Sequence, residues 1–254
     1  MLGQIVFWSF MGSVASLIGG VVLALRKKKF THHQTLLLTS FAAGVILATA
    51  FFDLLPEAVE AMGRIGPVGR IWEWVVAGVT WLFLLEKTLI WYHHHHEEHE
   101  MHGRAVPWMM TVGDTIHNFI DGVVMAGAFL VSPSVGIVTA LAVAAHEIPH
   151  EMADFGVLLA HGWSAKKTIL VNIGSAAVAL LGAILVYGAR GVIEPWLPHL
   201  MAFSGGAFVY LACSDLIPEL HHDHRHDRMS LLGQVAAFGA GLGAVWLLIR
   251  WLGG

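Results

Sequence analysis

The stretch GIVTALAVAAHEIPHEMADFGVLLA, residues 136–160, decides the fold. It is apolar at both ends and longer than the run of about 20 residues that a helix needs to span a bilayer. Its centre nevertheless carries His146, Glu147, His150, Glu151 and Asp154. An acid facing lipid at mid-membrane costs about 2.5–3.5 kcal/mol. The stretch therefore predicts a helix inside a bundle of membrane-spanning helices, with its polar side chains turned toward the interior.

The rest of the chain has the composition of a membrane protein. Of its 254 residues 56% are hydrophobic and 13% are charged, and the mean hydropathy is +0.68. Apolar runs of spanning length recur eight times, at 2–25, 34–60, 72–91, 107–130, 135–160, 168–188, 197–220 and 230–252. We expect an all-α, polytopic fold of eight transmembrane helices, with residues 1–254 forming a single transmembrane domain.

Basic residues predict the orientation of this bundle. Arg26, Lys27, Lys28 and Lys29 follow the first span, and loops rich in Lys and Arg stay in the cytoplasm. Eight spans threaded from there place ten basic residues at or near the inner face and leave only Arg64, Arg70, Arg190 and Arg250 outside. The predicted location is the cell (inner) membrane, with both termini outside.

An internal repeat relates the second and seventh spans. FAAGVILATAFFDLLPE (41–57) and FSGGAFVYLACSDLIPE (203–219) align at a constant offset of 162 residues. Spans two and seven cross in opposite directions, so spans 1–3 and 6–8 are predicted to form an inverted repeat around spans 4 and 5. The D-L-x-P-E match alone would also fit a common helix ending, but the wider Phe and Gly matches favour a repeat.

The fourth span, 107–130, carries its own polar face. At 100° per residue, four polar side chains fall within about 100° of one another on a helix: Asp114, His117, Asn118 and Asp121. The five polar residues of 136–160 likewise occupy one half of their helix. One or two Ser, Thr or Asn residues usually suffice to join two helices. Structural contact is therefore the weaker explanation, and the two faces are expected to meet at an interior site.

These residue types favour a divalent metal. Imidazole and carboxylate at i, i+4 spacing place two donors on one side of a helix, as in His117 with Asp121 and His146 with His150. Cys213 is the single cysteine, and nitrogen and oxygen ligands without thiolate suit Zn²⁺, Fe²⁺, Mn²⁺ or Cd²⁺. We expect two adjacent ions, one near His117, Asp121, His146 and His150 and the other nearer Asn118, Glu147 and Glu151.

Pro149 lies in the middle of this cluster. Proline has no N–H, so it frees the carbonyl of Ala145 and is expected to kink the helix there. Irregular backbone at membrane depth is tolerated where it lines protein or a water-filled cavity. A proline without a role is the alternative, and the flanking histidines and glutamates count against it.

Two histidine-rich loops lie on the predicted cytoplasmic side, at 92–105 and 221–228. Their composition is typical of metal-binding tracts, although a solvated loop without a specific role has the same composition. As secondary candidates along the metal pathway we take Asp114, Asp154, His93, His95, His221 and His222.

HNFIDG (117–122) and HEIPHE (146–151), with a histidine-rich loop between spans 3 and 4, resemble the ZIP zinc and iron transporters. The resemblance covers nearly the whole chain and is closest to the histidine-rich branch that bears HExPHE. It implies passage of divalent metal toward the cytoplasm through a two-metal site on the fourth and fifth helices. It also implies sliding of one helix group against another, and a homodimer, since members often form dimers. Zn²⁺ is then the transported substrate.

The resemblance also implies the ligands. His117, Asn118, Asp121, His146, Glu147 and His150 match family ligands, and Glu151 matches the second glutamate of the branch. Some members add a carboxylate from the sixth helix. Span 6 here has Asn172 and Ser175 but no interior acid, so we expect a weaker or differently shaped second position.

An intramembrane zinc metalloprotease is the alternative, because His146-Glu147-x-x-His150 fits H-E-x-x-H. Proline inside the motif, and an Ile120-Asp121-Gly122 element that precedes it, count against this function. A haem held by His117 and His150 would not crowd carboxylates beside its iron. We therefore expect no enzyme, no organic cofactor and no nucleic-acid partner, only divalent metal and the lipid bilayer.

Overall fold

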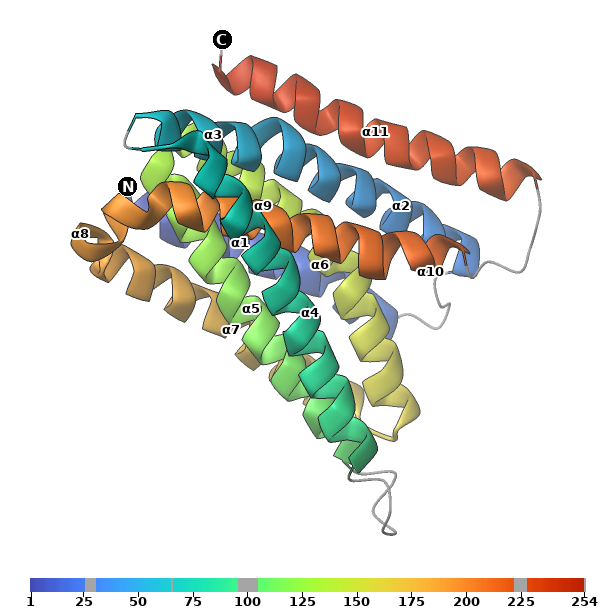
Figure 1. Ribbon diagram of the computed structural model, residues 1–254. Helices are drawn as coiled ribbons and strands as arrows, with labels where there is room; N and C mark the ends of the chain where they lie inside the picture. Colours follow the sequence, from blue (N-terminus) through green and yellow to red (C-terminus); the bar gives the residue numbers. More distant parts are fainter. Residues whose placement is uncertain (26–30, 65, 96–104, 222–227, 254) are drawn as a thin grey trace.

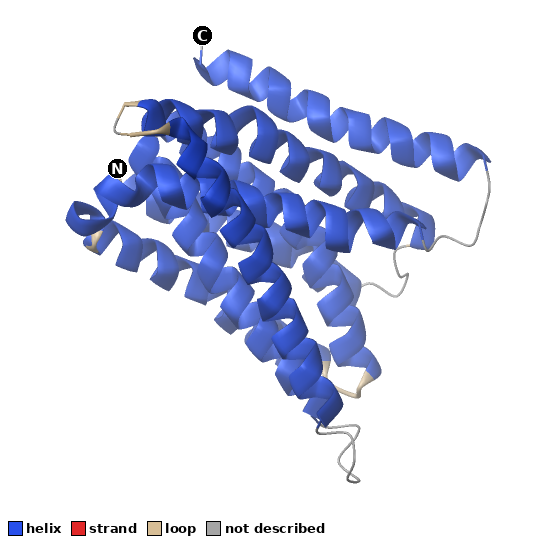
Figure 2. Cartoon of the chain, viewed as in Figure 1, coloured by secondary structure: helices blue, strands red, loops and turns tan. Residues whose placement is uncertain are grey.

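The computed structural model describes residues 1–25, 31–64, 66–95, 105–221 and 228–253 (Figure 1). Every regular element in these ranges is a helix (Figure 2). The long helices are α1 (Leu2–Leu25), α2 (His32–Thr49), α4 (Ile71–His95), α5 (Ala105–Val131), α6 (Pro133–Ala160), α7 (Ala165–Gly188), α9 (Leu197–Leu211) and α11 (Arg228–Gly253). The short ones are α3 (Leu55–Gly63), η2 (Val68–Arg70), α8 (Arg190–Ile193), η3 (Glu194–Trp196) and α10 (Ile217–His221). The prediction of an all-α fold is confirmed.

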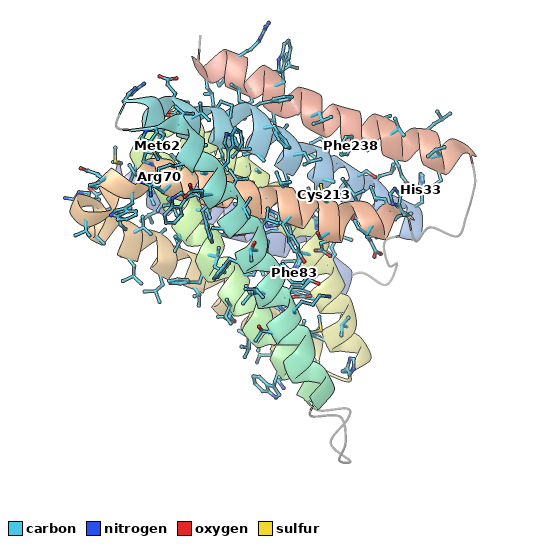
Figure 3. The ribbon with its side chains drawn as sticks, viewed as in Figure 1. His33, Met62, Arg70, Phe83, Cys213 and Phe238 are labelled. Atoms are coloured by element: carbon cyan, nitrogen blue, oxygen red, sulfur yellow. The ribbon has the colours of Figure 1, made fainter. Side chains whose placement is uncertain are left out.

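Five helical segments of the described chain are long and apolar enough to cross a membrane: His33–Gly63, Val68–Thr88, Ala165–Gly188, Arg190–His221 and Ser230–Leu252. A shorter apolar helix covers Leu2–Gly12. Large apolar side chains on α11, such as Leu231, Val235 and Leu247, are exposed, and side chains stand out from α4 and α11 along their length (Figure 3). Such faces suit contact with lipid chains.

Local capping fixes where the central helices begin and end. Ser132 accepts a hydrogen bond from the backbone N–H of Val135 at 3.2 Å and precedes Pro133, the first residue of α6. Gly162, with φ of +83°, follows the end of α6, where a left-handed residue stops a helix. Ser164 then caps α7. Short connections of this kind hold α5, α6 and α7 together in sequence order.

The histidine-rich loop predicted at 92–105 starts later than expected, because α4 continues to His95 and α5 begins at Ala105. No Gly or Pro occurs in the sequence from Tyr92 to His95, so no residue type there stops the helix. The second loop, predicted at 221–228, has its first residue in α10 and its last in α11. Residues 96–104 and 222–227 lie outside the described chain.

Two π-helical turns occur at repeat-related positions, η1 (Ala50–Leu54) and η4 (Ala212–Leu216). Pro56 and Pro218 follow them. A proline cannot donate to the carbonyl four residues earlier, and that carbonyl lies inside each wide turn. A proline two residues after the turn therefore accounts for the same π turn at two positions, 162 residues apart.

Glycines bring three helix pairs into close contact. A Cβ added at Gly44 on α2 would fall on the carbonyl oxygen of Phe238 on α11, and one at Gly241 on α11 would fall on that of Phe41 on α2. The same reciprocal relation joins α4 to α9 through Gly78 and Gly206, and α5 to α7 through Gly122 and Gly182. Small residues at helix contacts allow the backbones to approach, which is how helices associate in lipid.

The helices divide into two groups by their contacts. Helices α1, α5, α6 and α7 all contact one another, whereas α2 packs against α11 and α4 against α9. The groups meet where α2 contacts α6 and α5 contacts α9. Figure 1 shows α11 lying along α2 at the edge of the bundle, with both chain ends on the side of α3 and α8.

Candidate metal centre

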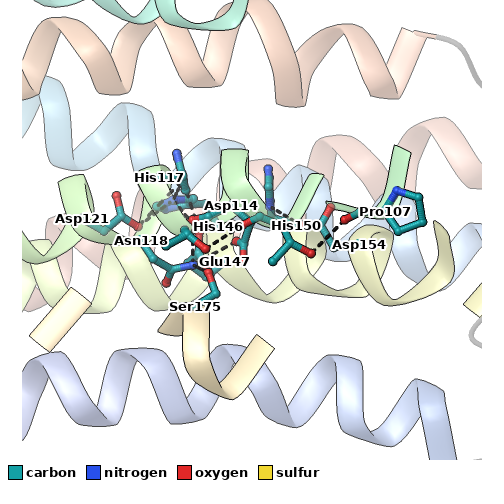
Figure 4. A network of polar contacts seen from close by, with 12 residues as sticks. Pro107, Asp114, His117, Asn118, Asp121, His146, Glu147, His150, Asp154 and Ser175 are labelled. Carbon is teal, nitrogen blue, oxygen red and sulfur yellow. Dashed lines mark hydrogen bonds and ion pairs between the residues drawn. The ribbon is translucent and has the colours of Figure 1, made fainter. Parts of the chain in front are cut away.

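The polar faces of α5 and α6 lie against each other inside the first helix group. The two helices contact each other, and the close view shows their polar side chains in a row from Asp121 to Asp154 (Figure 4). His146, Glu147 and Glu151 are 1%, 2% and 0% exposed. The two polar faces therefore meet inside the bundle, as predicted from the sequence.

Four side chains form the first cluster, defined as His117, Asp121, His146 and Glu147, with ligand atoms all within 4.8 Å of one another. Nε2 of His117 lies 3.2 Å from Nε2 of His146 and 3.3 Å from Oε1 of Glu147. Nε2 of His146 lies 3.4 Å from Oδ2 of Asp121 and 3.5 Å from Oε1 of Glu147. A tetrahedral Zn²⁺ with ligands at about 2.1 Å spaces its donor atoms roughly 3.4 Å apart, so the first cluster has the dimensions of a zinc site.

The ring of His146 is oriented by a backbone contact. Its Nδ1 donates to the carbonyl oxygen of Ala142 at 3.1 Å, which leaves Nε2 of the neutral ring with a free lone pair. Such a contact to the far nitrogen fixes ring orientation in metal-ligating histidines. The edge of the ring also packs against Phe208 on α9, with ring centroids 6.1 Å apart.

The carboxylates of this region lack compensating positive charge. Both oxygens of Glu147 and Glu151, and Oδ2 of Asp114 and Asp121, are buried without a hydrogen-bond partner among the described residues. Within the described chain their ion pairs are with histidines, and no Lys or Arg pairs with them. Buried carboxylates are stable only when paired, protonated or bound to metal, so the site is suited to a cation.

Two further clusters continue the row. The second cluster comprises Asp114, Glu147 and Glu151, and the third comprises Asp114, His150 and Asp154. The prediction grouped His150 with His117, Asp121 and His146; in the structure Glu147 completes that set, and the ring of His150 stacks on His117 with centroids 5.3 Å apart. Glu147 and Asp114 are each shared by two clusters, so the three are contiguous.

Asn118 and Ser175 support the second cluster. Nδ2 of Asn118 donates to Oδ1 of Asp114 at 2.9 Å and to Oγ of Ser175 on α7 at 3.3 Å. This hydrogen bond to Ser175 is not predicted from the sequence. Its signal is a pair of polar residues in the apolar middle of α7, Asn172 and Ser175, which are both buried. α7 therefore reaches the site through a hydroxyl rather than a carboxylate.

The four histidines proposed as secondary candidates belong to none of these clusters. His93 and His95 lie in the last turn of α4, but the positions of their side chains are outside what the structure describes. His221 is exposed at the end of α10, and His222 is not among the described residues.

Comparison with known proteins identifies relatives of this architecture. The family model described as "ZIP Zinc transporter" matches residues 3–107 and 91–249. Zinc transporter ZIP13 of Pongo abelii is 33% identical over 198 residues, 72% of this chain and 58% of that protein. Zinc transporter ZIP4 of Mus musculus is 39% identical over 138 residues, 54% of this chain and 21% of that protein. Zinc transporter foi of Drosophila melanogaster is 33% identical over 151 residues, 59% of this chain and 21% of that protein.

The chain spans less than two thirds of the length of each of these relatives. All three are named as transporters and none as an enzyme. Together with the apolar helices, they identify an integral membrane protein. The resemblance carried by HNFIDG and HEIPHE is thereby confirmed: the chain belongs to the ZIP zinc transporter family.

Proposed function

We propose that this protein carries Zn²⁺, and also Fe²⁺, Mn²⁺ or Cd²⁺, across the membrane toward the cytoplasm through a two-metal site between α5 and α6. The observation that carries the proposal is the first cluster: four nitrogen and oxygen donors, three of them from buried residues, all within 4.8 Å of one another and with no Lys or Arg paired to them in the described chain. The relatives named as zinc transporters support Zn²⁺ as the principal substrate.

The two positions correspond to adjacent clusters. The first ion binds His117, Asp121, His146 and Glu147, with His150 stacked beside His117. The second ion binds Glu147 and Glu151 together with Asp114, which Asn118 holds in place. Glu147 is common to both and can pass an ion from one to the other. A site of mixed donors binds less tightly than a closed thiolate cage, as release requires.

Eight membrane spans arranged as an inverted repeat complete the proposed architecture. The π turns η1 and η4 support this repeat, because they occupy matching positions 162 residues apart. Two helix contacts also match in the repeat, that of α2 with α11 and that of α9 with α4. Gly44 on α2 and Gly206 on α9 occupy matching positions, and a Cβ added at either would fall on a backbone carbonyl oxygen of the partner helix. In such transporters the binding site lies at the repeat interface near mid-membrane.

The proposed location is the cell (inner) membrane with both termini outside, as the positive charge of residues 26–29 suggests. Chain ends on the same side of the bundle support an even number of spans (Figure 1). A homodimer is proposed from the family resemblance alone.

Movement of one helix group against the other is the proposed means of alternating access. The glycine contacts support this division, since each lies within one group: α5 with α7 in the first, and α2 with α11 and α4 with α9 in the second. The metal clusters would then travel with α5 and α6. Histidines of 92–105 and 221–228 are proposed to receive the ion at the inner side through weak, labile contacts.

A metalloprotease is disfavoured by the arrangement of the HEIPHE side chains. In H-E-x-x-H enzymes both histidines bind one zinc and the glutamate acts as base. Here His146 lies in the first cluster and His150 in the third, and Oε1 of Glu147 lies 3.5 Å from Nε2 of His146, as a ligand would.

Flux of ⁶⁵Zn into proteoliposomes, with each other metal in competition, tests the proposed function. Wild-type protein should take up zinc, and Glu147→Ala should not, because both metal positions lose a shared ligand. Glu73→Gln, which changes an exposed carboxylate on α4, is the matched control. Zinc uptake by Glu147→Ala equal to that of the wild type would refute the two-metal site, and absence of uptake by folded wild-type protein would refute the function.

A further inference from the structure

The third cluster, Asp114, His150 and Asp154, has the composition of a metal site, and two of its members, His150 and Asp154, are ligands in neither of the two positions described above. One ligand atom from each residue lies within 4.8 Å of the others. Nδ1 of His150 lies 3.9 Å from Oδ2 of Asp154. Imidazole with two carboxylates is a donor set used by Zn²⁺ and by Mn²⁺ or Fe²⁺.

Asp114 has one oxygen that is left without a hydrogen bond. Its Oδ1 accepts a hydrogen bond from Asn118 at 2.9 Å, whereas Oδ2 has no hydrogen-bond partner among the described residues, although the residue is only 4% exposed. Nδ1 of His150 is likewise buried without a hydrogen bond in the described chain. A buried carboxylate oxygen and a buried ring nitrogen left unpaired are costly unless a proton or a metal cation binds them.

The third cluster lies at one end of the row. α5 and α6 run in opposite senses, so the series Asp121, His117, Asp114 and the series His146, His150, Asp154 both advance toward the end that holds Ala105 and Ala160. The side chains of His150 and Asp154 are 32% and 11% exposed. In the first cluster His117 is 17% exposed and the other three side chains are 1–5% exposed. The third cluster is therefore the most exposed of the three.

We propose that Asp114, His150 and Asp154 form a third metal-binding position, from which the ion leaves the protein toward the cytoplasm. Its place in transport rests on the proposed function, whereas its ability to bind a divalent ion does not. Asp114 belongs also to the second cluster and can accompany the ion between the two. Three protein donors leave coordination positions free for water, as in sites that exchange their ligands. Departure into solvent then requires fewer bonds to break at once.

Equilibrium binding of ¹⁰⁹Cd²⁺ to purified protein tests this position directly. His117→Ala with Glu151→Gln removes one ligand from the first cluster and one from the second, and leaves the third complete. This double variant should still bind Cd²⁺. Adding Asp154→Asn should weaken that binding by at least about tenfold, the loss typical of removing a metal-supporting group. Adding Glu73→Gln instead should leave it unchanged.

Unchanged Cd²⁺ affinity after Asp154→Asn would overturn the third position, as would a monodisperse double variant that binds no Cd²⁺. Should the double variant not purify as a folded protein, the single variants decide. Asp154→Asn should then lower the maximal rate of ⁶⁵Zn uptake with little change in KM, and Asp154→Glu should restore it; an unaltered maximal rate overturns the proposal. Absence of flux in the wild type would refute transport but leave the Cd²⁺ result standing.

Discussion

Nε2 of His117 on α5 lies 3.2 Å from Nε2 of His146 on α6, and Oε1 of Glu147 lies within 3.5 Å of both. Nδ1 of His146 donates to the carbonyl oxygen of Ala142, so the neutral ring presents a lone pair to His117. With Nε2 of His117 also unprotonated, two ring lone pairs and a carboxylate oxygen face one point, which is the donor arrangement that a divalent cation binds. This relationship is the physical basis for a divalent ion in the first cluster.

Removal of the imidazole at position 117 should strongly reduce zinc transport. His117→Ala takes a donor from the first cluster and leaves Glu147 without its contact at 3.3 Å. ⁶⁵Zn uptake into proteoliposomes is expected to fall by at least about tenfold, with an unchanged elution profile in size-exclusion chromatography. Normal uptake by a correctly folded variant would remove His117 from the ligands.

Acidification should weaken uptake at low metal concentration. Histidine ligands must be deprotonated to bind metal, and imidazole ordinarily titrates at a pH of about 6.5. The apparent KM for zinc should therefore rise between pH 7.5 and pH 5.5, while saturating zinc restores the rate. A KM independent of pH over that range would argue against histidine ligands.

The contact between α5 and α7 should not tolerate a methyl group. Gly122→Ala would place a Cβ on the carbonyl oxygen of Ala179, whereas Gly174→Ala on α7 meets open space. Overpacking of this kind costs about 1–3 kcal/mol, so Gly122→Ala should lower the Tm in detergent and Gly174→Ala should not. Equal Tm values for Gly122→Ala and Gly174→Ala would show that α5 and α7 leave room for a methyl group at position 122.

Deletion of residues 96–102 should leave transport in place. The three clusters lie on α5 and α6, and the deleted residues follow the end of α4. The capacity for metal on the proposed cytoplasmic side is expected to change, while initial ⁶⁵Zn uptake continues. Complete loss of uptake would show that this segment is part of the transport pathway itself.

The polar faces could be predicted from the sequence because helical periodicity alone decides them. At 100° per residue Asp114, His117 and Asp121 share a face whatever surrounds the helix, and the cost of charge in lipid requires that face to turn inward. Expectation and structure agree on this point, and on the all-helical fold.

The assignment of each ligand to a cluster could not be predicted in the same way. Periodicity gives the direction of a side chain but not the axial shift between two helices, and that shift decides whether Glu147 or His150 joins His117. The π turns at 50–54 and 212–216 are not predicted, although the sequence repeat that contains them can be recognised. Their signal is the proline two residues beyond each turn, since its ring displaces a backbone hydrogen bond.

Anomalous diffraction from crystals grown with Zn²⁺ or Cd²⁺ tests the central claim most directly. We expect a peak among His117, Asp121, His146 and Glu147, with donor distances of about 2.0–2.2 Å for zinc. A metal-loaded crystal with no anomalous peak between α5 and α6, or with these side chains turned toward lipid, would contradict the account.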